Sequence, residues 1–174
     1  MMTMQVAFYK GRTPWVFSGP IRDRLRTVKH AAYDRVAPWW LHGPYSHVEL
    51  ILGIDDQSMS ICASSSIRDG GVRIKHMHLK PENWDVIDAP ARCNVYDAWH
   101  WLAQHIDDPY DWRGSAGFVL PPLGHNESKV NCGEAVAAML GIPDPWRYHP
   151  CNLRPFLEWR IATYQAPRPK EAVA

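Results

Sequence analysis

The chain has 174 residues, which is enough for one domain with a real core and too few for two domains of ordinary size. Hydrophobic residues make up 46% of it, charged residues 21%, and the formal net charge is +1, a composition that does not favour nucleic-acid binding. No apolar run approaches the roughly 18 residues of a membrane span. We therefore expect a single domain over residues 1–164 and a flexible tail over 165–174.

Runs of β-branched and aromatic residues predict strands, and apolar residues at spacings of three and four predict helices. The expected strands are 4–9, 47–54, 59–64, 72–79 and 84–89, and the expected helices are 21–36, 94–106 and 132–140. Because short consecutive strands joined by turns pair with their neighbours, we expect an antiparallel sheet packed by helices, an α+β fold. The basic residues of 21–36 are expected on its solvated face. Residues 112–130 lack periodicity and are expected to form a long loop, with His125 in a candidate lid.

The cysteines and the N-terminus indicate the cellular compartment in which the protein is expected. The four cysteines are widely separated and form no CxxC pair. The N-terminus lacks the basic start, the apolar run and the small-residue cleavage site of a secretory signal. Free thiols and a cytoplasmic protein are therefore expected, or a virion-associated or lysis-released protein if the gene belongs to a phage.

Cys132 lies between Asn131 and the small-residue run GEAVAA, so its thiol is expected in the first turn of a helix. The unpaired N–H groups and the positive end of the helix dipole favour a thiolate there, and the same N–H groups can stabilise an oxyanion. The ordinary alternative is packing, because free cysteine is among the most buried residue types. Of the four cysteines, Cys132 is the best placed to be a nucleophile, provided that a base lies nearby.

Among the nine histidines, His47 differs because it begins a strand directly after a loop, in PYSHVELIL. Cysteine hydrolases hold an imidazole within hydrogen-bond reach of the sulfur, and a strand supplies the rigidity that this needs. We therefore predict that His47 is the general base for Cys132. His76 and His78 have a spacing that can bind metal, but no further ligand cluster accompanies them, so neither a metal nor a cofactor is expected.

A third polar group usually orients such a histidine. If DDQS closes a tight hairpin, the strand partner of His47 is Ser64 or Ser66, depending on the register, and either hydroxyl can accept the far imidazole N–H. Glu49 is a charged competitor, because it lies two residues from His47 on the same strand face. Ser64 is the first choice for the third catalytic residue.

Four segments follow one another in an informative order: SHVEL around His47, CASSSIRDGGVR, YDWRG at 110–114, and NCGEAVAAMLG around Cys132. Together they resemble the permuted papain-like branch of the NlpC superfamily, which includes YiiX-like proteins and many phage proteins. The resemblance spans about residues 4 to 158. The histidine strand precedes the cysteine helix, which is the reverse of the order in papain and in the unpermuted NlpC enzymes.

The resemblance implies a circularly permuted papain-like fold in which Cys132 is the nucleophile, His47 the base, and a residue of the following strand the third member. YiiX-like proteins are similar to a pattern with glutamate in that strand, whereas this chain has SICASSS, so Cys62 or a nearby serine occupies the region. The motif also has Gly133 where serine is common. The expected activity is hydrolysis of an amide or related acyl bond in a peptide or acyl-bearing small substrate, with cell-wall peptides as the phage-related case.

Two alternatives to hydrolysis stay open from the sequence. The unusual third position also fits a catalytically weak or inactive binding module, or a virion-associated one, that keeps the fold. The nine tryptophans point the same way if they line a groove instead of the core. Acyl transfer would use the same dyad of Cys132 and His47.

Overall fold

The computed structural model describes residues 4–11, 20–117 and 126–165. The elements in chain order are β1 (Gln5–Tyr9), α1 (Ile21–Trp40), β2 (His47–Ile54), β3 (Ser60–Ser66), β4 (Gly71–Met77), β5 (Trp84–Asp88), α2 (Val95–His105), α3 (Trp112–Gly117), α4 (Cys132–Met139), the 3₁₀ turn η2 (Pro145–Arg147) and α5 (Pro150–Gln165). Of the expected tail over 165–174, Gln165 is the last residue of α5, and residues 166–174 lie outside the described residues, as does the candidate lid residue His125.

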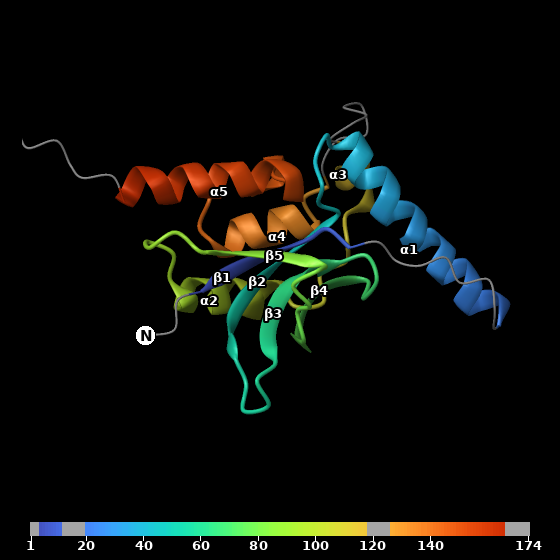
Figure 1. Cartoon of the computed structure of the whole chain (residues 1–174), viewed down its shortest axis with the longest axis horizontal. Helices are drawn as coiled ribbons and strands as arrows, with labels where there is room; N and C mark the ends of the chain where they lie inside the picture. Colours follow the sequence, from blue (N-terminus) through green and yellow to red (C-terminus); the bar gives the residue numbers. More distant parts are fainter. Residues whose placement is uncertain (1–3, 12–19, 118–125, 166–174) are drawn as a thin grey trace, which may run out of the picture.

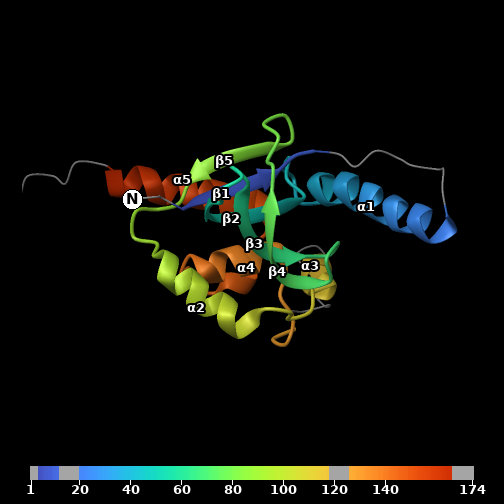
Figure 2. The same cartoon turned by 90° about the horizontal axis from the view of Figure 1, so that it is seen from below.

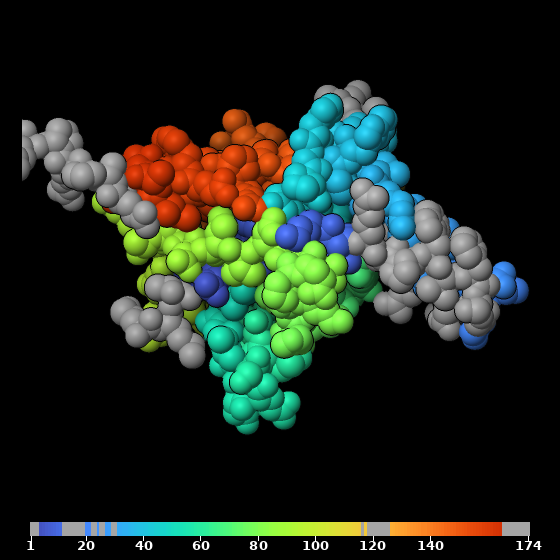
Figure 3. All heavy atoms as spheres, viewed as in Figure 1, coloured from blue at the N-terminus to red at the C-terminus, as the bar shows by residue number. Residues whose placement is uncertain are grey.

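The five strands form one antiparallel sheet in the order β4-β3-β2-β1-β5, so that β2 is its central strand (Figure 1). The predicted hairpin is formed by β2 and β3, whose far end projects from the body of the molecule (Figure 3). Its register contains an irregularity between Ile51 and Gly53, which no residue pattern had indicated. The α+β class and the antiparallel sheet are thus confirmed.

One face of the sheet carries the main core and is covered by helices. Figure 2 shows α2 and α4 on one side of the strands. Strand alternation turns Val48 and Leu50 of β2 toward these helices, and both side chains are fully buried. The helices supply the other half of this core through Ala98, Leu102, Val136, Leu153 and Leu157. Because α4 is buried along nearly its whole length, the position of its first residue is fixed by the core.

The opposite face of the sheet carries a small apolar cluster and a group of charged side chains. The cluster is formed by Ala7, Ile51 and Cys62, with Trp84 packed against it. His47 and Glu49 alternate with the core residues of β2 and therefore belong to this opposite face. As the first residue of β2, His47 stands at the end of the sheet.

Helix α1 forms as predicted and continues past Pro38, and part of its apolar stripe is exposed. Ile21 and Val36 are 71% and 46% exposed, whereas Ala31 and Asp34 are buried. The reason is visible in Figure 1, where α1 projects from the rest of the molecule, so that only part of it can contact the body. Ile21 and Val36 of this stripe therefore have no core to pack into.

The C-terminal half departs from the sequence prediction in two places. The expected loop 112–130 begins with the short helix α3, which follows the buried Asp111. Helix α5 had no predicted counterpart, because Pro150 and Pro155 argue against helix in a sequence pattern. Pro150 is the first residue of α5, where proline is well tolerated.

Candidate active site

Helix α4 begins at Cys132 itself, and a capping box fixes its first turn. The Asn131 side chain accepts a hydrogen bond from the Glu134 N–H at 3.1 Å, and the Glu134 carboxylate accepts one from the Asn131 N–H at 3.3 Å. Gly133 lies so close to the chain before α5 that an added Cβ would stand 2.3 Å from the carbonyl oxygen of Tyr148. A side chain larger than glycine therefore does not fit at this position unless the Tyr148 segment moves.

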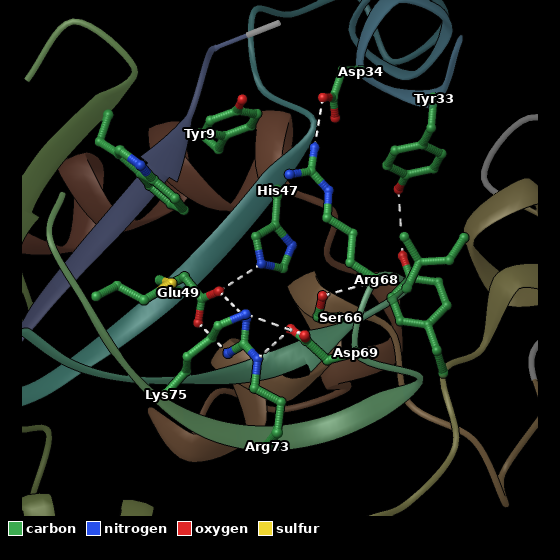
Figure 4. A pocket seen from close by; sticks show the side chains of 14 residues that line it. Tyr9, Tyr33, Asp34, His47, Glu49, Ser66, Arg68, Asp69, Arg73 and Lys75 are labelled. Atoms are coloured by element: carbon green, nitrogen blue, oxygen red, sulfur yellow. Dashed lines mark hydrogen bonds and ion pairs between the residues drawn. The ribbon is translucent and has the colours of Figure 1, made fainter. Parts of the chain in front are cut away.

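His47 lies between two partners at the end of the sheet. The Cys132 side chain lies near enough to the imidazole to contribute to raising its pKa. Its Nε2 lies 2.7 Å from Oε1 of Glu49 (Figure 4). The ring of Trp84 stands edge-on to the imidazole, with the ring centroids 6.4 Å apart. The structure therefore brings together the predicted nucleophile and the predicted base.

Glu49 is held in place from the side opposite His47. Two guanidinium nitrogens of Arg73 bond its two carboxylate oxygens, Nη1 to Oε2 at 2.7 Å and Nη2 to Oε1 (Figure 4). Arg73 is itself positioned by Asp69, whose Oδ2 accepts from Nε at 2.9 Å. A bidentate guanidinium–carboxylate pair fixes the plane of the carboxylate as well as its distance. Glu49 is 1% exposed, so this paired geometry is also shielded from water.

These contacts shift the pKa values of both members of the pair. Burial on its own would lower the pKa of His47, but the charge of Glu49 and the hydrogen bond with Cys132 outweigh it and raise the pKa to about 9. Burial would raise the pKa of Glu49, but the Arg73 hydrogen bond and the charge of His47 lower it to about 2. Near neutral pH the carboxylate is therefore ionised and the imidazole protonated.

Ser64, the first choice for the third residue, does not bond the imidazole. Its hydroxyl donates to the carbonyl oxygen of Val48 at 2.7 Å, whereas Nε2 of His47 meets Glu49. The register sets Ser64 opposite Arg73, in the strand that separates Glu49 from Arg73. A small side chain at this point leaves room for the guanidinium to reach across β3. The prediction for Ser64 is thus corrected: the charged competitor on the strand of His47 itself takes the position.

The other two residues considered for this position also have different surroundings. Ser66 accepts a hydrogen bond at its Oγ from the Arg68 N–H, at 3.2 Å, within the turn after β3. Cys62 is fully buried against Ala7 and Ile51. Burial, followed by the negative charge of Glu49, raises the pKa of the Cys62 thiol to about 12. Cys62 is therefore an inert thiol of the packing kind.

Two tyrosines that the sequence analysis did not single out stand near the nucleophile. The hydroxyl of Tyr33, from α1, lies 3.3 Å from that of Tyr110, which in turn lies 3.0 Å from Oγ of Ser115. Burial raises the pKa of both tyrosines, and both side chains line the same cavity as Cys132. Tyr110 belongs to the YDWRG segment, so a signal for it existed, whereas no pattern marked Tyr33.

The YDWRG segment also braces the chain that leads into α4. Asp111 is fully buried, and its carboxylate accepts hydrogen bonds from the Gly114 N–H at 2.9 Å and from the Asn126 N–H at 3.2 Å. Its own N–H donates to the carbonyl oxygen of Val130 at 3.1 Å. One aspartate thus ties the start of α3 to the strand-like segment two residues before Cys132.

Two cavities of opposite character open at the dyad and share Tyr33, Ile67 and Tyr110 as a wall. The first, of about 110 Å³, contains His47 and six charged side chains: Asp34, Glu49, Arg68, Asp69, Arg73 and Lys75 (Figure 4). The second, of about 480 Å³, has Cys132 in its lining and runs along α1. We call them the charged cavity and the apolar groove. Cys132 and His47 thus face cavities of different character.

The HxH pair of β4 has a partner outside this site. Nδ1 of His76 bonds Oδ2 of Asp55 in the hairpin loop. Within the described part of the chain, no three His, Cys, Asp or Glu side chains converge as metal ligands. No helix in those same ranges is long and apolar enough to cross a bilayer.

The tryptophans divide between core and surface. Trp101 packs against the main core, and its ring stacks on His105 at 4.2 Å. Trp40 and Trp112 line the apolar groove and are 41% and 58% exposed.

Comparison of the chain with models of protein families, with curated proteins and with solved structures finds no match.

Proposed function

We propose that the protein is a cysteine hydrolase that cleaves an amide or related acyl bond, with Cys132 as nucleophile and His47 as general base. The observation that carries this proposal is the series Cys132–His47–Glu49–Arg73. Hydrogen bonds join His47 to Glu49 and Glu49 to Arg73, and the Cys132 side chain lies near enough to His47 to contribute to raising its pKa. The four residues come from α4, β2 and β4. A buried carboxylate held by a buried arginine has no evident structural need of a histidine beside it. It does serve to orient an imidazole for catalysis.

In this proposal the hydrolysis proceeds through the following steps. The Cys132 sulfur attacks the carbonyl carbon, and its proton resides on His47. The N–H groups of Cys132 and Gly133, in the first turn of α4, stabilise the oxyanion. His47 then passes the proton to the leaving atom, whose bond to the carbonyl carbon breaks, and an acyl-cysteine remains. Water, deprotonated by His47, releases the acid and restores the thiol.

The arrangement of the elements supports the resemblance to the permuted papain-like branch of the NlpC superfamily. The strand that begins with His47 precedes the helix that begins with Cys132, and both lie at one antiparallel sheet. In our proposal the glutamate of the triad comes from the histidine strand itself, at Glu49, and not from the strand that follows. The missing third residue had been the main reason to consider an inactive binding or virion-associated module, and Glu49 removes that reason.

A simple acyl donor tests this function. With 4-nitrophenyl acetate, we expect the wild-type protein to release nitrophenolate and to gain one acetyl group on Cys132, detected by intact and peptide mass spectrometry. Cys132→Ser and His47→Ala should each lose at least about 100-fold of the rate. Cys93→Ser is the matched control, because Cys93 lies before α2 and donates to the Leu140 carbonyl oxygen, at 3.4 Å.

Equal rates in the wild type and in Cys132→Ser would contradict the proposal. Acyl transfer is distinguished in the same assay by adding an amine. Release of free acetate identifies a hydrolase, whereas an acetylated amine as the main product identifies a transferase that uses the same dyad.

A further inference from the structure

The apolar groove is distinguished by the chemistry of its walls. Among the residues that the structure describes, its lining contains no Asp, Glu, Lys or Arg, whereas the charged cavity on the other side of the dyad has six such side chains. Alanine, valine and tryptophan side chains of α1 form one wall: Ala32, Val36, Ala37 and Trp40. Trp112 of α3 and Pro150 of α5 contribute to the rest. Its volume of about 480 Å³ falls in the usual range for a small-molecule site.

Four polar side chains of the groove, Tyr33, Tyr110, Ser115 and Asn131, are already engaged in hydrogen bonds within the protein. The hydroxyls of Tyr33 and Tyr110 lie 3.3 Å apart, and that of Tyr110 lies 3.0 Å from Ser115. The Asn131 side chain belongs to the capping box of α4. Burial lowers the pKa of His149 to about 4, so that this wall residue is uncharged near neutral pH. A ligand rich in amides or carboxylates would lose its hydration in the groove without gaining equivalent partners.

The position of Cys132 connects the groove to the proposed chemistry. The nucleophile is a lining residue of the groove, so a chain lying there has one end within reach of the sulfur. The stripe of α1 that finds no core also supplies this wall, since Ala32 and Val36 belong to both. Exposed apolar surface that borders a reactive group is typical of a binding site.

We propose that the apolar groove binds the acyl chain of the substrate, and that this substrate is an ester, thioester or amide of an unbranched apolar acid. The proposal rests on the function assigned above and narrows its substrate class. It disfavours cell-wall peptides, whose amide and carboxylate groups belong in a polar site. The carbonyl lies at Cys132, the S–C bond forms there, and the leaving group departs toward His47 with the proton.

Alkyl methanethiosulfonates test the groove without requiring hydrolysis. The Cys132 sulfur displaces methanesulfinate and forms a mixed disulfide, which places the alkyl chain directly beside it. The ethyl, hexyl and decyl reagents are compared below their micelle concentrations, and each rate at Cys132 is divided by the rate at Cys93 in the same sample. Since a fully buried methylene strengthens binding by about threefold to fourfold, the decyl reagent should exceed the ethyl reagent by at least about tenfold.

Two substitutions should remove this rise, which is measured in each variant as the ratio of its own decyl rate to its own ethyl rate. Ala37→Phe fills the groove, and Ala103→Phe is its matched control at an exposed position of α2. Val36→Asp adds a carboxylate to the wall at a position that is 46% exposed, so that folding should tolerate it. Its control is Val86→Asp on β5, at 44% exposure.

Equal ethyl and decyl rates at Cys132, or a rise that survives in both groove variants, would overturn the inference. The same variants are then assayed with 4-nitrophenyl acetate, butyrate and octanoate. One outcome is that no ester gives nitrophenolate release that depends on Cys132, while the rise in rate with alkyl chain length persists. The proposed hydrolase activity is then wrong, and the proposed acyl-chain site stands. If acetate is hydrolysed and octanoate is no better, the hydrolase stands and the acyl-chain site falls.

Discussion

At the scale of single residues, His47 has a demanding position, because it must contact a thiol on one side and a carboxylate on the other. The strand supplies this geometry. Residues two apart on a strand point to the same side, so Glu49 reaches the imidazole without a turn or a long-range contact. Arg73 then prevents the buried carboxylate from turning away. The charge of the imidazole depends on this pair, and this dependence can be measured.

Glu49→Gln should lower the pKa of His47 from about 9 to about 6.5 or below, because burial then acts without the opposing negative charge. The pKa is read from the imidazole carbon-bound proton by NMR, and the resonance is assigned by its absence in His47→Gln. Asp69→Asn is the control, since Asp69 bonds Arg73 and Lys75. A pKa of His47 that stays at about 9 in Glu49→Gln would show that the carboxylate is not its main partner.

The same shift predicts how stability depends on pH. The folded-state pKa of His47, about 9, is above its ordinary value of 6.5, so its contribution is fully present below pH 6.5 and is lost as the pH rises through 9. In urea titrations, the free energy of unfolding of the wild type relative to His47→Gln should fall by about 2 kcal/mol between those two pH values. A constant difference between the two proteins across this range would contradict the assignment.

Residue-level patterns predicted part of this site. Cys132 was found because a helix start has a sequence signature, and His47 because it opens a strand after a loop. Glu49 was recognised only as a competitor, since a tight hairpin would have placed Ser64 or Ser66 opposite His47. Arg73 was not found at all, because its partner lies two strands away in the sheet. Such a contact depends on strand order, which a single sequence does not state.

At the scale of elements, the site depends on how closely α4 approaches the chain before α5. Gly133 makes that approach possible, and its residue type is therefore tested directly. In an ordinary helix, replacing glycine with alanine is stabilising by about 1 kcal/mol. Here the Cβ would meet the Tyr148 carbonyl oxygen, so the sign of the effect should reverse.

We expect Gly133→Ala to destabilise the protein by about 2 kcal/mol, from overpacking against fixed backbone, in denaturant unfolding. Ala138→Gly, at a half-buried position of the same helix, measures the propensity effect alone and should destabilise by about 1 kcal/mol. If Gly133→Ala instead stabilises the protein, the close approach of the Tyr148 segment is wrong.

The elements themselves were the most predictable feature. Strand and helix patterns located the hairpin of β2 and β3, helix α2 and the start of α4. The errors have physical causes. The spacing of apolar residues on α1 shows that this helix is amphipathic. Periodicity does not show what the apolar side of a helix contacts, and part of that side is exposed here. Residues 112–117 form a helix that depends on Asp111, a buried contact without a periodic signal.

At the scale of the whole molecule, the described elements form a compact body from which α1 projects (Figure 1). Asp34 is the clearest anchor of this helix, since it accepts hydrogen bonds from Ser46 at 3.2 Å and from Arg68 at 2.7 Å. Tyr33 is the second, through Tyr110. Helix α1, which forms one wall of the apolar groove, is therefore anchored to the body at its Tyr33–Asp34 end and projects from the body at the other end.

Hydrogen exchange should report this difference. Amides over residues 21–30 of α1 are expected to exchange at least about 100-fold faster than those of β2 and β3, because local opening of a projecting helix leaves the core intact. The exchange is measured by peptide mass spectrometry near pH 7. Amides at the anchored end, over residues 34–37, should be slower than those at the projecting end. Uniform protection along α1 would mean that the helix is packed over its full length.

The central claim is that the fold holds Cys132 against His47 so that the thiol is activated. The most direct measurement is the pH dependence of alkylation of Cys132 by iodoacetamide, followed by peptide mass spectrometry, in the wild type and in His47→Ala. We predict fast alkylation of wild-type Cys132 well below about pH 8, and in His47→Ala a profile like that of an ordinary thiol, near about pH 8.5. If wild-type Cys132 titrates like a free cysteine and His47→Ala changes nothing, Cys132 is not the nucleophile of a catalytic pair.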